Sequence, residues 1–147
     1  MADDPTARAL RALLLLLTGG GTLAVCTDLL LLGHYKDSNQ LIPLTVAAAG
    51  LLSIAWVATA PRPGSLRALQ FVMLCFIGTG IIGVTLHSKG GITAQREVDP
   101  SLEGRNLFWK VVAAPDPPVL SPGIMVQLGL LGLVSTYRHP GLREEQP

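Results

Sequence analysis

The chain has 147 residues, of which 49% are hydrophobic and 14% are charged, and its formal net charge is +1. This charged fraction lies far below the roughly 25% that is usual for a soluble domain. A nucleic-acid-binding protein is excluded, because neither the net charge nor any run of arginine or lysine offers a surface for phosphates. A mean hydropathy of +0.47 instead indicates that lipid surrounds much of the chain.

Four apolar stretches of membrane-spanning length determine the predicted fold. They cover about residues 12–32, 41–60, 66–86 and 119–137. Each is close to the ~20 residues that cross ~30 Å of hydrocarbon at ~1.5 Å per residue. We therefore predict an all-α membrane protein, with a single transmembrane domain over residues 1–147 in which four helices form an up-down bundle.

The first stretch follows Arg8 and Arg11, as the core of a secretory signal would. Leu23–Cys26 approaches the sequence that precedes a lipid-modified cysteine, but Val25 is larger than the small residue that cleavage at such a site requires. About 21 residues also exceed the ~7–15 apolar residues of a signal core. We expect this stretch to be a retained membrane helix.

The first helix is predicted to end at Gly33, a natural left-handed stop, before a short polar turn over residues 34–39. A turn of this length makes the first and second helices antiparallel neighbours. Ser38 or Asn39 is the predicted cap of the second helix. Pro43 lies near the first turn of that helix, where a missing N–H costs little.

The cluster Pro61–Gly64 is a helix breaker that separates the second and third helices. Ser65 is the predicted cap of the third helix, which runs through the third apolar stretch to His87. Lys89–Gly91 is the predicted stop of this helix. Further along the chain, Ser121–Gly123 is expected to supply the cap and first turn of the fourth helix.

Residues 88–120 form the long connection of the chain, with a soluble-like composition, and we assign it to the extracytoplasmic side. Asp99 as cap and Pro100 at the first helical position predict a helix over residues 100–114. Its polar positions gather on one face, which predicts an amphipathic helix in the headgroup region or on top of the bundle. The apolar positions of this interfacial helix include Leu102, Phe108 and Trp109.

The distribution of basic residues predicts the orientation in the membrane. The side that holds both chain ends and the loop after the second helix carries six arginines, which are Arg8, Arg11, Arg62, Arg67, Arg138 and Arg143. The opposite side carries Lys36 in a short turn and further cations diluted over the long connection. Because short cytoplasmic loops are enriched in arginine and lysine, we predict a multi-pass protein of the bacterial inner (plasma) membrane with both termini in the cytoplasm.

Asp28 is the acid that lies inside an apolar stretch, near the outer end of the first helix. A charge costs ~2.5–3.5 kcal/mol at mid-membrane and less near the edge, so a partner is expected to offset this cost. The candidate partners on the same side are Thr85, His87, His34 and Lys36. Two interpretations stay open for Asp28, a proton- or ion-handling carboxylate and a structural aspartate that bonds a neighbouring helix.

His34 and His87 fall at one membrane face in this topology, which raises the hypothesis of a metal or bis-histidine haem site. Haem ligands in helical bundles usually lie inside apolar stretches, whereas these two histidines lie at helix ends. Histidines at helix ends more often bridge lipid headgroups and water. His139 lies on the other face and cannot join them. We therefore predict no cofactor and no metal ion.

Glycines recur inside the first, third and fourth apolar stretches and predict close helix contacts. They are Gly19, Gly20, Gly21, Gly78, Gly80, Gly83, Gly129 and Gly132. Small residues let membrane helices approach closely, within one chain or between chains. Gln70 and Gln127 are amides inside the third and fourth helices, where we expect interhelical hydrogen bonds. Cys26 and Cys75 are interpreted as packing residues, because two unplaced cysteines specify neither a disulfide nor a metal site.

Several short sequences together resemble a group of short bacterial four-helix membrane proteins. They are His34–Asp37, Gln40–Leu44, Asp99–Leu102, Gln127–Leu133 and Tyr137–Pro140. The resemblance covers most of the chain and implies the four-helix topology. The group has no assigned activity, so the resemblance assigns no functional residue.

The sequence contains no serine–histidine–acid arrangement, CxxC, HExxH or glycine-rich phosphate loop. We therefore predict a non-enzymatic integral membrane protein that is an accessory or stabilising subunit of a larger membrane complex. Its predicted partners are the lipid bilayer and other membrane protein subunits. Two alternatives stay open. One is a small ion, proton or solute transporter component that uses Asp28, and the other is a haem- or quinone-binding electron-transfer subunit.

Overall fold

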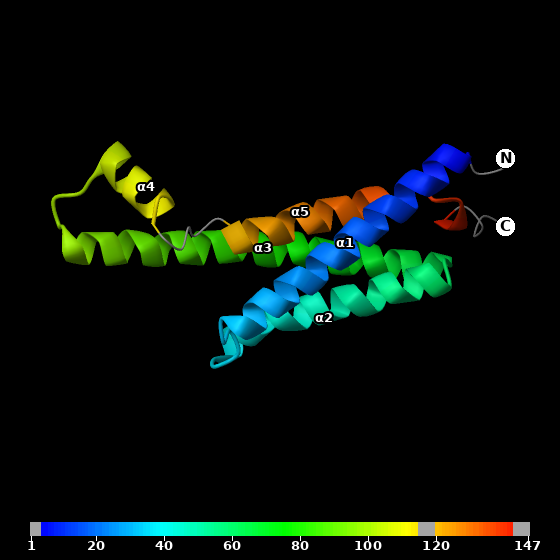
Figure 1. Ribbon diagram of the computed structural model, residues 1–147, viewed down its shortest axis with the longest axis horizontal. Helices are drawn as coiled ribbons and strands as arrows, with labels where there is room; N and C mark the ends of the chain where they lie inside the picture. Colours follow the sequence, from blue (N-terminus) through cyan, green and yellow to red (C-terminus); the bar gives the residue numbers. More distant parts are fainter. Residues whose placement is uncertain (1–3, 115–119, 143–147) are drawn as a thin grey trace.

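The computed structural model describes residues 4–114 and 120–142, and every element in these ranges is a helix (Figure 1). The elements are α1 (Pro5–Leu31), α2 (Ser38–Thr59), α3 (Pro63–Val98), α4 (Gly104–Val112), α5 (Leu120–Ser135) and a short 3-10 helix, η1 (Pro140–Leu142). The all-α prediction is confirmed. Within the described ranges, α1, α2 and α3 are long and apolar enough to cross a membrane.

Four helices pack side by side into a helical body, which consists of α1, α2, the part of α3 up to His87, and α5. α3 packs against both α2 and α5, and α1 packs against the same two helices from the other side. In the described part of the chain, the backbones of α1 and α3 do not meet. Figure 1 shows α1 lying across α2 and α5, with the N- and C-terminal ends of the chain at the same end of the body.

The core of the body is built around large side chains of α3. Leu66, Leu69, Met73 and Phe76 have no exposed surface. These four positions follow the three- and four-residue spacing that places side chains on one face of a helix. The ring of Phe76 lies over Gly50 of α2, where an added Cβ atom would come within 2.7 Å of it. A glycine at this position therefore lets α2 and α3 approach closely around the ring.

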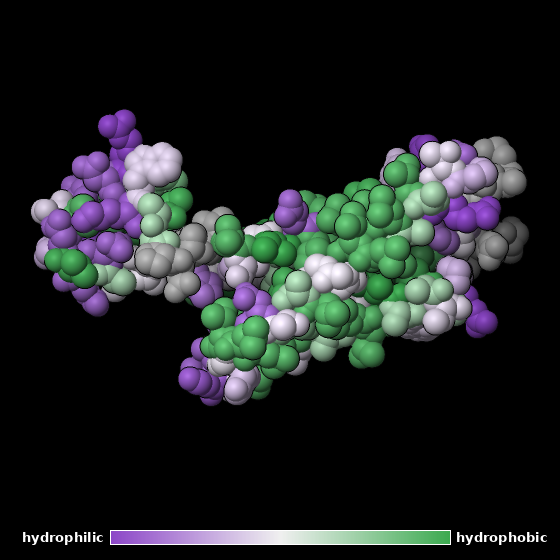
Figure 2. All heavy atoms as spheres, in the orientation of Figure 1, coloured by the Kyte–Doolittle hydropathy of each residue, from purple (hydrophilic) through white to green (hydrophobic). Residues whose placement is uncertain are grey.

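The outer surface of the body is hydrophobic, as the green area in Figure 2 shows. Leu16 of α1 and Leu52 of α2 are each 73% exposed, and Phe71 of α3 is 68% exposed. A soluble monomer rarely exposes contiguous apolar surface of this kind. The three long apolar helices and this surface are compatible with a membrane protein.

The predicted end of the first helix is confirmed by its backbone geometry. Gly33 adopts a left-handed conformation with φ of 65°. Its N–H bonds the carbonyl of Leu30 at 3.1 Å, and the N–H of His34 bonds the carbonyl of Leu29 at 2.9 Å. This pair of bonds is the Schellman arrangement, which satisfies carbonyls that the last helical turn would leave unpaired. α1 begins earlier than the predicted span, at Pro5, where the Asp4 side chain accepts a bond from the N–H of Thr6.

The predicted end of the third helix is wrong. α3 does not stop at Lys89–Gly91 but continues to Val98, and at 36 residues it is far longer than a single membrane crossing needs. Glycine permits a left-handed stop without imposing one, and neither Gly90 nor Gly91 has a positive φ. The reason lies in tertiary packing, because Val111 of α4 lies directly against the α3 backbone at Gly91.

The predicted helix over residues 100–114 is shorter in the structure. α4 comprises nine residues and follows Glu103, whereas Asp99 ends α3 instead of beginning α4. The Asp99 carboxylate accepts hydrogen bonds from the N–H and the hydroxyl of Ser101, at 3.0 and 2.6 Å. Asp99 thus holds the turn between the two helices. An Asp side chain accepts a bond from the N–H two residues onward both in such a turn and at the start of a helix, so Asp before Pro is typical of either structure.

Three further helix starts differ from their predictions. The residue before α2 is Asp37, not the predicted Ser38 or Asn39. Ser65 is not the residue before α3 but lies in its first turn, where its hydroxyl accepts a bond from the N–H of Arg62 and donates to the carbonyl of Ala60. α5 is described from Leu120 onward, so Ser121 lies inside the helix. It ends at Ser135, two residues before the predicted end at residue 137. Residue 119 lies outside the described ranges.

Candidate functional site

Three polar residues that the sequence singled out, Asp28, His34 and His87, gather at the end of the body opposite the chain termini. We call this the distal end, and it comprises the turn of residues 32–37, Asp28 of α1, His87 of α3 and Ser121 of α5. The remainder of α3, residues 88–98, extends past the distal end and carries α4 on its side (Figure 1). We call these two segments, residues 88–98 and α4, the projection.

Asp28 bonds a different residue from those proposed as its partners. Its Oδ2 atom accepts a hydrogen bond from the hydroxyl of Ser121 at 3.3 Å. The Asp28 side chain is exposed rather than buried in the body. The bond joins the last turns of α1 to the first turn of α5, so in this structure Asp28 connects two helices. The sequence did not indicate Ser121 as the partner, because Ser before Pro is typical of a helix cap. The hydroxyl of a cap residue bonds its own helix and is not expected to donate to another one.

His34 and His87 are brought together, as the predicted topology requires. Their ring centroids lie 6.3 Å apart, with 26° between the ring planes. His34 is half-buried and His87 is exposed. His139 lies near the chain termini, where its Nδ1 atom accepts a bond from the N–H of Gly141. Among the described residues, no group of three or more His, Cys, Asp or Glu side chains has a metal-binding arrangement.

A groove of about 450 Å³ separates the two parts of the projection. Its walls are mainly small or apolar residues of α3 and α4, which include Leu86, Gly90, Gly91, Ala94 and Val111. His87 stands at its edge and supplies an imidazole that can donate or accept a hydrogen bond. Gly90 and Gly91 contribute no side chain to the groove, and Val111 lies against Gly91 in its wall.

Most of the predicted contact glycines lie where two helices meet. Added Cβ atoms would reach Ile54 from Gly19, Leu128 from Gly21, Val126 from Gly80, Pro122 from Gly83, Ile77 from Gly129 and Met73 from Gly132. Gly20 and Gly78 have no atom within 4 Å of such a Cβ atom, so within this chain they face open space. Close approaches lie between α3 and α5, at Gly80, Gly129 and Gly132, and between α1 and α5, at Gly21.

The two predicted interhelical amides behave differently. Gln70 of α3 donates from Nε2 to Oγ1 of Thr136, just beyond α5, at 3.0 Å. Thr136 is 1% exposed, so this bond is sheltered within the body. Gln127 is exposed on the outer side of α5 and makes no hydrogen bond within the described ranges. The interhelical hydrogen bond that the sequence predicts for Gln127 is therefore not formed within the described part of the chain.

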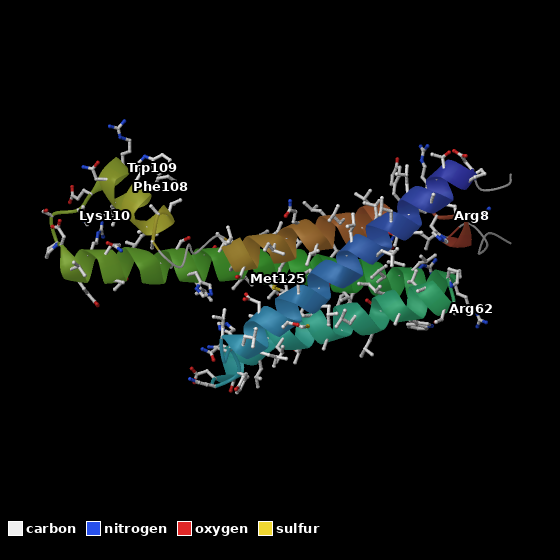
Figure 3. The ribbon with its side chains drawn as sticks, viewed as in Figure 1. Arg8, Arg62, Phe108, Trp109, Lys110 and Met125 are labelled. Carbon is white, nitrogen blue, oxygen red and sulfur yellow. The ribbon has the colours of Figure 1, made fainter. Side chains whose placement is uncertain are left out.

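α4 presents its aromatic residues outward, which corrects the predicted apolar face. Leu107 and Val111 are the residues that bury against α3, at 6% and 5% exposure. Phe108 and Trp109 are exposed and contact one another edge to face, with centroids 5.4 Å apart (Figure 3). Leu102 is half-buried in the preceding turn. The predicted amphipathic helix is therefore present, but it packs on α3 with one stripe and leaves a second apolar stripe free.

The interior of the body contains hydroxyl groups but no ionisable side chain among the described residues. The hydroxyls bond carbonyls of their own helices. Thr18 bonds Leu14, Thr22 bonds Thr18, Ser53 bonds Gly50 and Ser135 bonds Gly132, at 2.6–2.9 Å. In each of these bonds the hydroxyl donates its proton to a carbonyl, so its polar group is satisfied within its own helix. No buried side-chain nitrogen or oxygen among the described residues lacks a partner.

No protein-family model, curated protein or solved structure matches the chain.

Proposed function

We propose that the chain is a non-enzymatic accessory or stabilising subunit of a larger complex in the bacterial inner membrane. In this proposal, α1, α2, α3 and α5 cross the bilayer as an up-down bundle. α5 provides ~24 Å from its 16 helical residues. Ser121 and Thr136 lie at the two ends of this segment, and its length suits a thin or locally compressed bilayer.

The orientation in this proposal follows from the placement of the arginines. Arg8 and Arg62 lie at the end of the body that also holds the chain termini (Figure 3). The Arg11 guanidinium donates to the carbonyl of Arg138 at 3.2 Å, which adds two more cations to that end. Short cytoplasmic segments are enriched in such residues, so both termini are assigned to the cytoplasm and the projection to the opposite side.

The observation that carries the proposal is the projection. Its surface is largely hydrophilic in Figure 2, yet Phe108 and Trp109 stand exposed on it. Aromatic residues are enriched at protein interfaces, where they supply most of the binding energy. A hydrophobic pair on a polar surface, held by a helix that Leu107 and Val111 fasten to α3, fits a docking contact with another subunit.

The interior of the body supports an accessory role over transport by one chain. Ion and proton paths through membranes require ionisable or polar side chains that face a shared cavity. Asp28 is instead exposed and bonded to Ser121, and the centre is filled by Met73 and Phe76. An enzyme would likewise need a group of reactive residues in a pocket.

The test is purification of the full-length chain from native membranes in a mild detergent, with quantitative mass spectrometry of what accompanies it. We expect one or more membrane proteins to co-purify with the wild type and to fall at least about tenfold with Phe108→Ala/Trp109→Ala. Arg105→Ala/Asn106→Ala, which changes exposed residues of the same helix, is the matched control and should retain them. Equal recovery with the aromatic variant, or no protein above an unrelated membrane protein, contradicts the proposal.

A further inference from the structure

Gln127 is a polar side chain on an otherwise apolar outer surface. It is exposed, and its neighbours along the helix, Ile124 and Leu130, are exposed as well. At ~1.5 Å per residue, Gln127 lies about 9 Å from Ser121 and about 14 Å from Thr136. Ser121 lies in the first turn of α5 and Thr136 directly follows its last residue, so the two residues mark the two ends of the helix. If α5 crosses the bilayer, the amide of Gln127 therefore lies near its centre.

The amide cannot satisfy itself as the exposed hydroxyls of the body do. Thr27 and Thr85 each bond a carbonyl four residues earlier in their own helix, at 2.9 Å. A glutamine amide carries two donors and an acceptor, and the mid-helix N–H groups that its oxygen would need as donors are already paired. Gln127 makes no hydrogen bond within the described part of the chain. Hydrocarbon offers it no partner, so leaving it against lipid is costly.

The residues around Gln127 form a stripe with the spacing of a helix-pairing surface. The stripe is Leu120, Ile124, Gln127, Leu131 and Val134, with successive steps of four, three, four and three residues. This spacing keeps one face of a helix against another in left-handed pairs, in water and in membranes. The opposite face of α5 is occupied by α1 and α3. The stripe is thus the side of α5 that remains available.

We propose that two copies of this chain associate through the stripe of α5, with their Gln127 side chains hydrogen-bonded to each other. All copies enter the membrane in one orientation, so a twofold axis along the membrane normal places both amides at the same depth. Each amide both donates and accepts, which makes the pair self-complementary. A different partner would need its own polar group at that depth. The inference rests on the proposed crossing of α5 and not on the accessory role.

The first test measures association of the purified full-length chain in liposomes by energy transfer between labelled copies at falling protein-to-lipid ratios. We expect Gln127→Leu to weaken association by about 3- to 30-fold, the range that interhelical amide bonds support. Gln127→Asn keeps an amide and should retain most of the association. Leu52→Gln places an amide on the lipid-facing side of α2, which does not contact α5, and should not restore association to Gln127→Leu.

The second test locates the contact by cross-linking single cysteines in a background that lacks Cys26 and Cys75. We expect Ile124→Cys and Val134→Cys to form disulfide-linked dimers in membranes, and Leu52→Cys to form none. A membrane-impermeant maleimide identifies the cause of any failure. Labelling at Ile124→Cys shows that α5 does not cross, whereas protection without cross-linking shows that α5 crosses but does not pair.

Several results would overturn the pairing. They are a monomeric wild type at every lipid ratio, unchanged association of Gln127→Leu, or cross-linking at Leu52→Cys equal to that at Ile124→Cys. Because Gln127 is exposed, none of its substitutions enters the core of one copy. Equal helical content of all variants by circular dichroism verifies that each one folds.

Discussion

Gly91 of α3 lies directly beneath Val111 of α4, where an added Cβ atom would come within 3.1 Å of Cγ1 of the valine. The neighbouring Gly90 faces open space. Two adjacent glycines therefore have different roles in one helix, since Gly91 receives α4 and Gly90 does not. The contact holds the projection together at the point where the sequence resembles a helix stop.

Gly91→Leu is expected to displace α4 from α3. The larger side chain overpacks the contact with Val111, at a typical cost of about 1–3 kcal/mol. Amide hydrogen exchange over Leu107–Val111 should accelerate about tenfold or more. Gly90→Ala is the matched control and should leave this exchange unchanged or slower, because alanine favours a helix over glycine by about 1 kcal/mol. Equal exchange in both variants would show that Gly91 does not support α4.

Gly129→Ala is expected to destabilise the packing of α5 on α3. An added Cβ atom would lie 2.7 Å from the Met73 carbonyl oxygen, and a backbone atom cannot move aside as a side chain can. The expected loss is about 1–3 kcal/mol in reversible unfolding in mixed micelles. Gly78→Ala serves as the control, because nothing lies within 4 Å of its Cβ position. A loss at Gly78 as large as that at Gly129 would contradict this assignment.

The predicted elements that hold in the structure depend on local signals. Gly33 ends α1 because a left-handed glycine, the polar turn and the apolar period all agree there. Lys89–Gly91 misled because packing overrides this local signal, and Asp99–Pro100 misled because Asp99 accepts bonds from Ser101 in a turn instead of capping a helix. The sequence alone contains no indication that Val111 would lie over Gly91. The partner of Asp28 was missed on the same ground, because Ser121 is 93 residues away in the chain.

The Gln70–Thr136 bond is expected to contribute a measurable coupling between α3 and the end of α5. Gln70→Leu, Thr136→Val and the double variant form a cycle in unfolding free energy. The coupling should be about 0.6–1.7 kcal/mol, the range found for hydrogen bonds between membrane helices. A coupling of zero would mean that the bond is not formed in the membrane.

Asp28→Asn is expected to leave the proton permeability of liposomes unchanged. In the wild-type structure Asp28 accepts from Ser121 and is exposed, and the buried residues of the described part of the body include no ionisable side chain that would continue a proton path from it. Proton flux should be measured by an enclosed pH-sensitive dye under an imposed potential, with protein-free liposomes as control. Flux in the wild type that falls in Asp28→Asn would support the transporter alternative instead.

The turn between α3 and α4 is expected to depend on pH at low values. Hydrogen bonds from the side chain and backbone of Ser101 lower the pKa of Asp99 below its ordinary value of 3.8, and Lys110 adds to the effect. A lowered pKa means that the ionised carboxylate stabilises the turn above pH 3.8 and that this contribution disappears as the pH falls through the folded-state pKa.

Titration of the Asp99 carboxyl carbon by NMR measures this dependence. The midpoint should lie below 3.8 in the wild type and rise towards 3.8 in Ser101→Ala, because the dominant hydrogen bonds are then reduced. A wild-type midpoint at or above 3.8 would show that the Ser101 bonds do not form. Ser101→Thr retains the hydroxyl and should keep the lowered midpoint.

Because α3 is one uninterrupted helix, its packing in the body determines the direction in which Phe108 and Trp109 point. Met73 and Phe76 are wholly buried and fix how α3 is turned about its own axis. Because each residue turns an α-helix by about 100°, the rotation of α3 about its axis at Phe76 determines which way Gly91 faces, about four turns further along the helix. Phe108 and Trp109 therefore have one fixed angular position about the axis of α3. A repacking that rotated α3 by a single residue would move them by more than a quarter of a turn, out of contact with a partner that fits the original position.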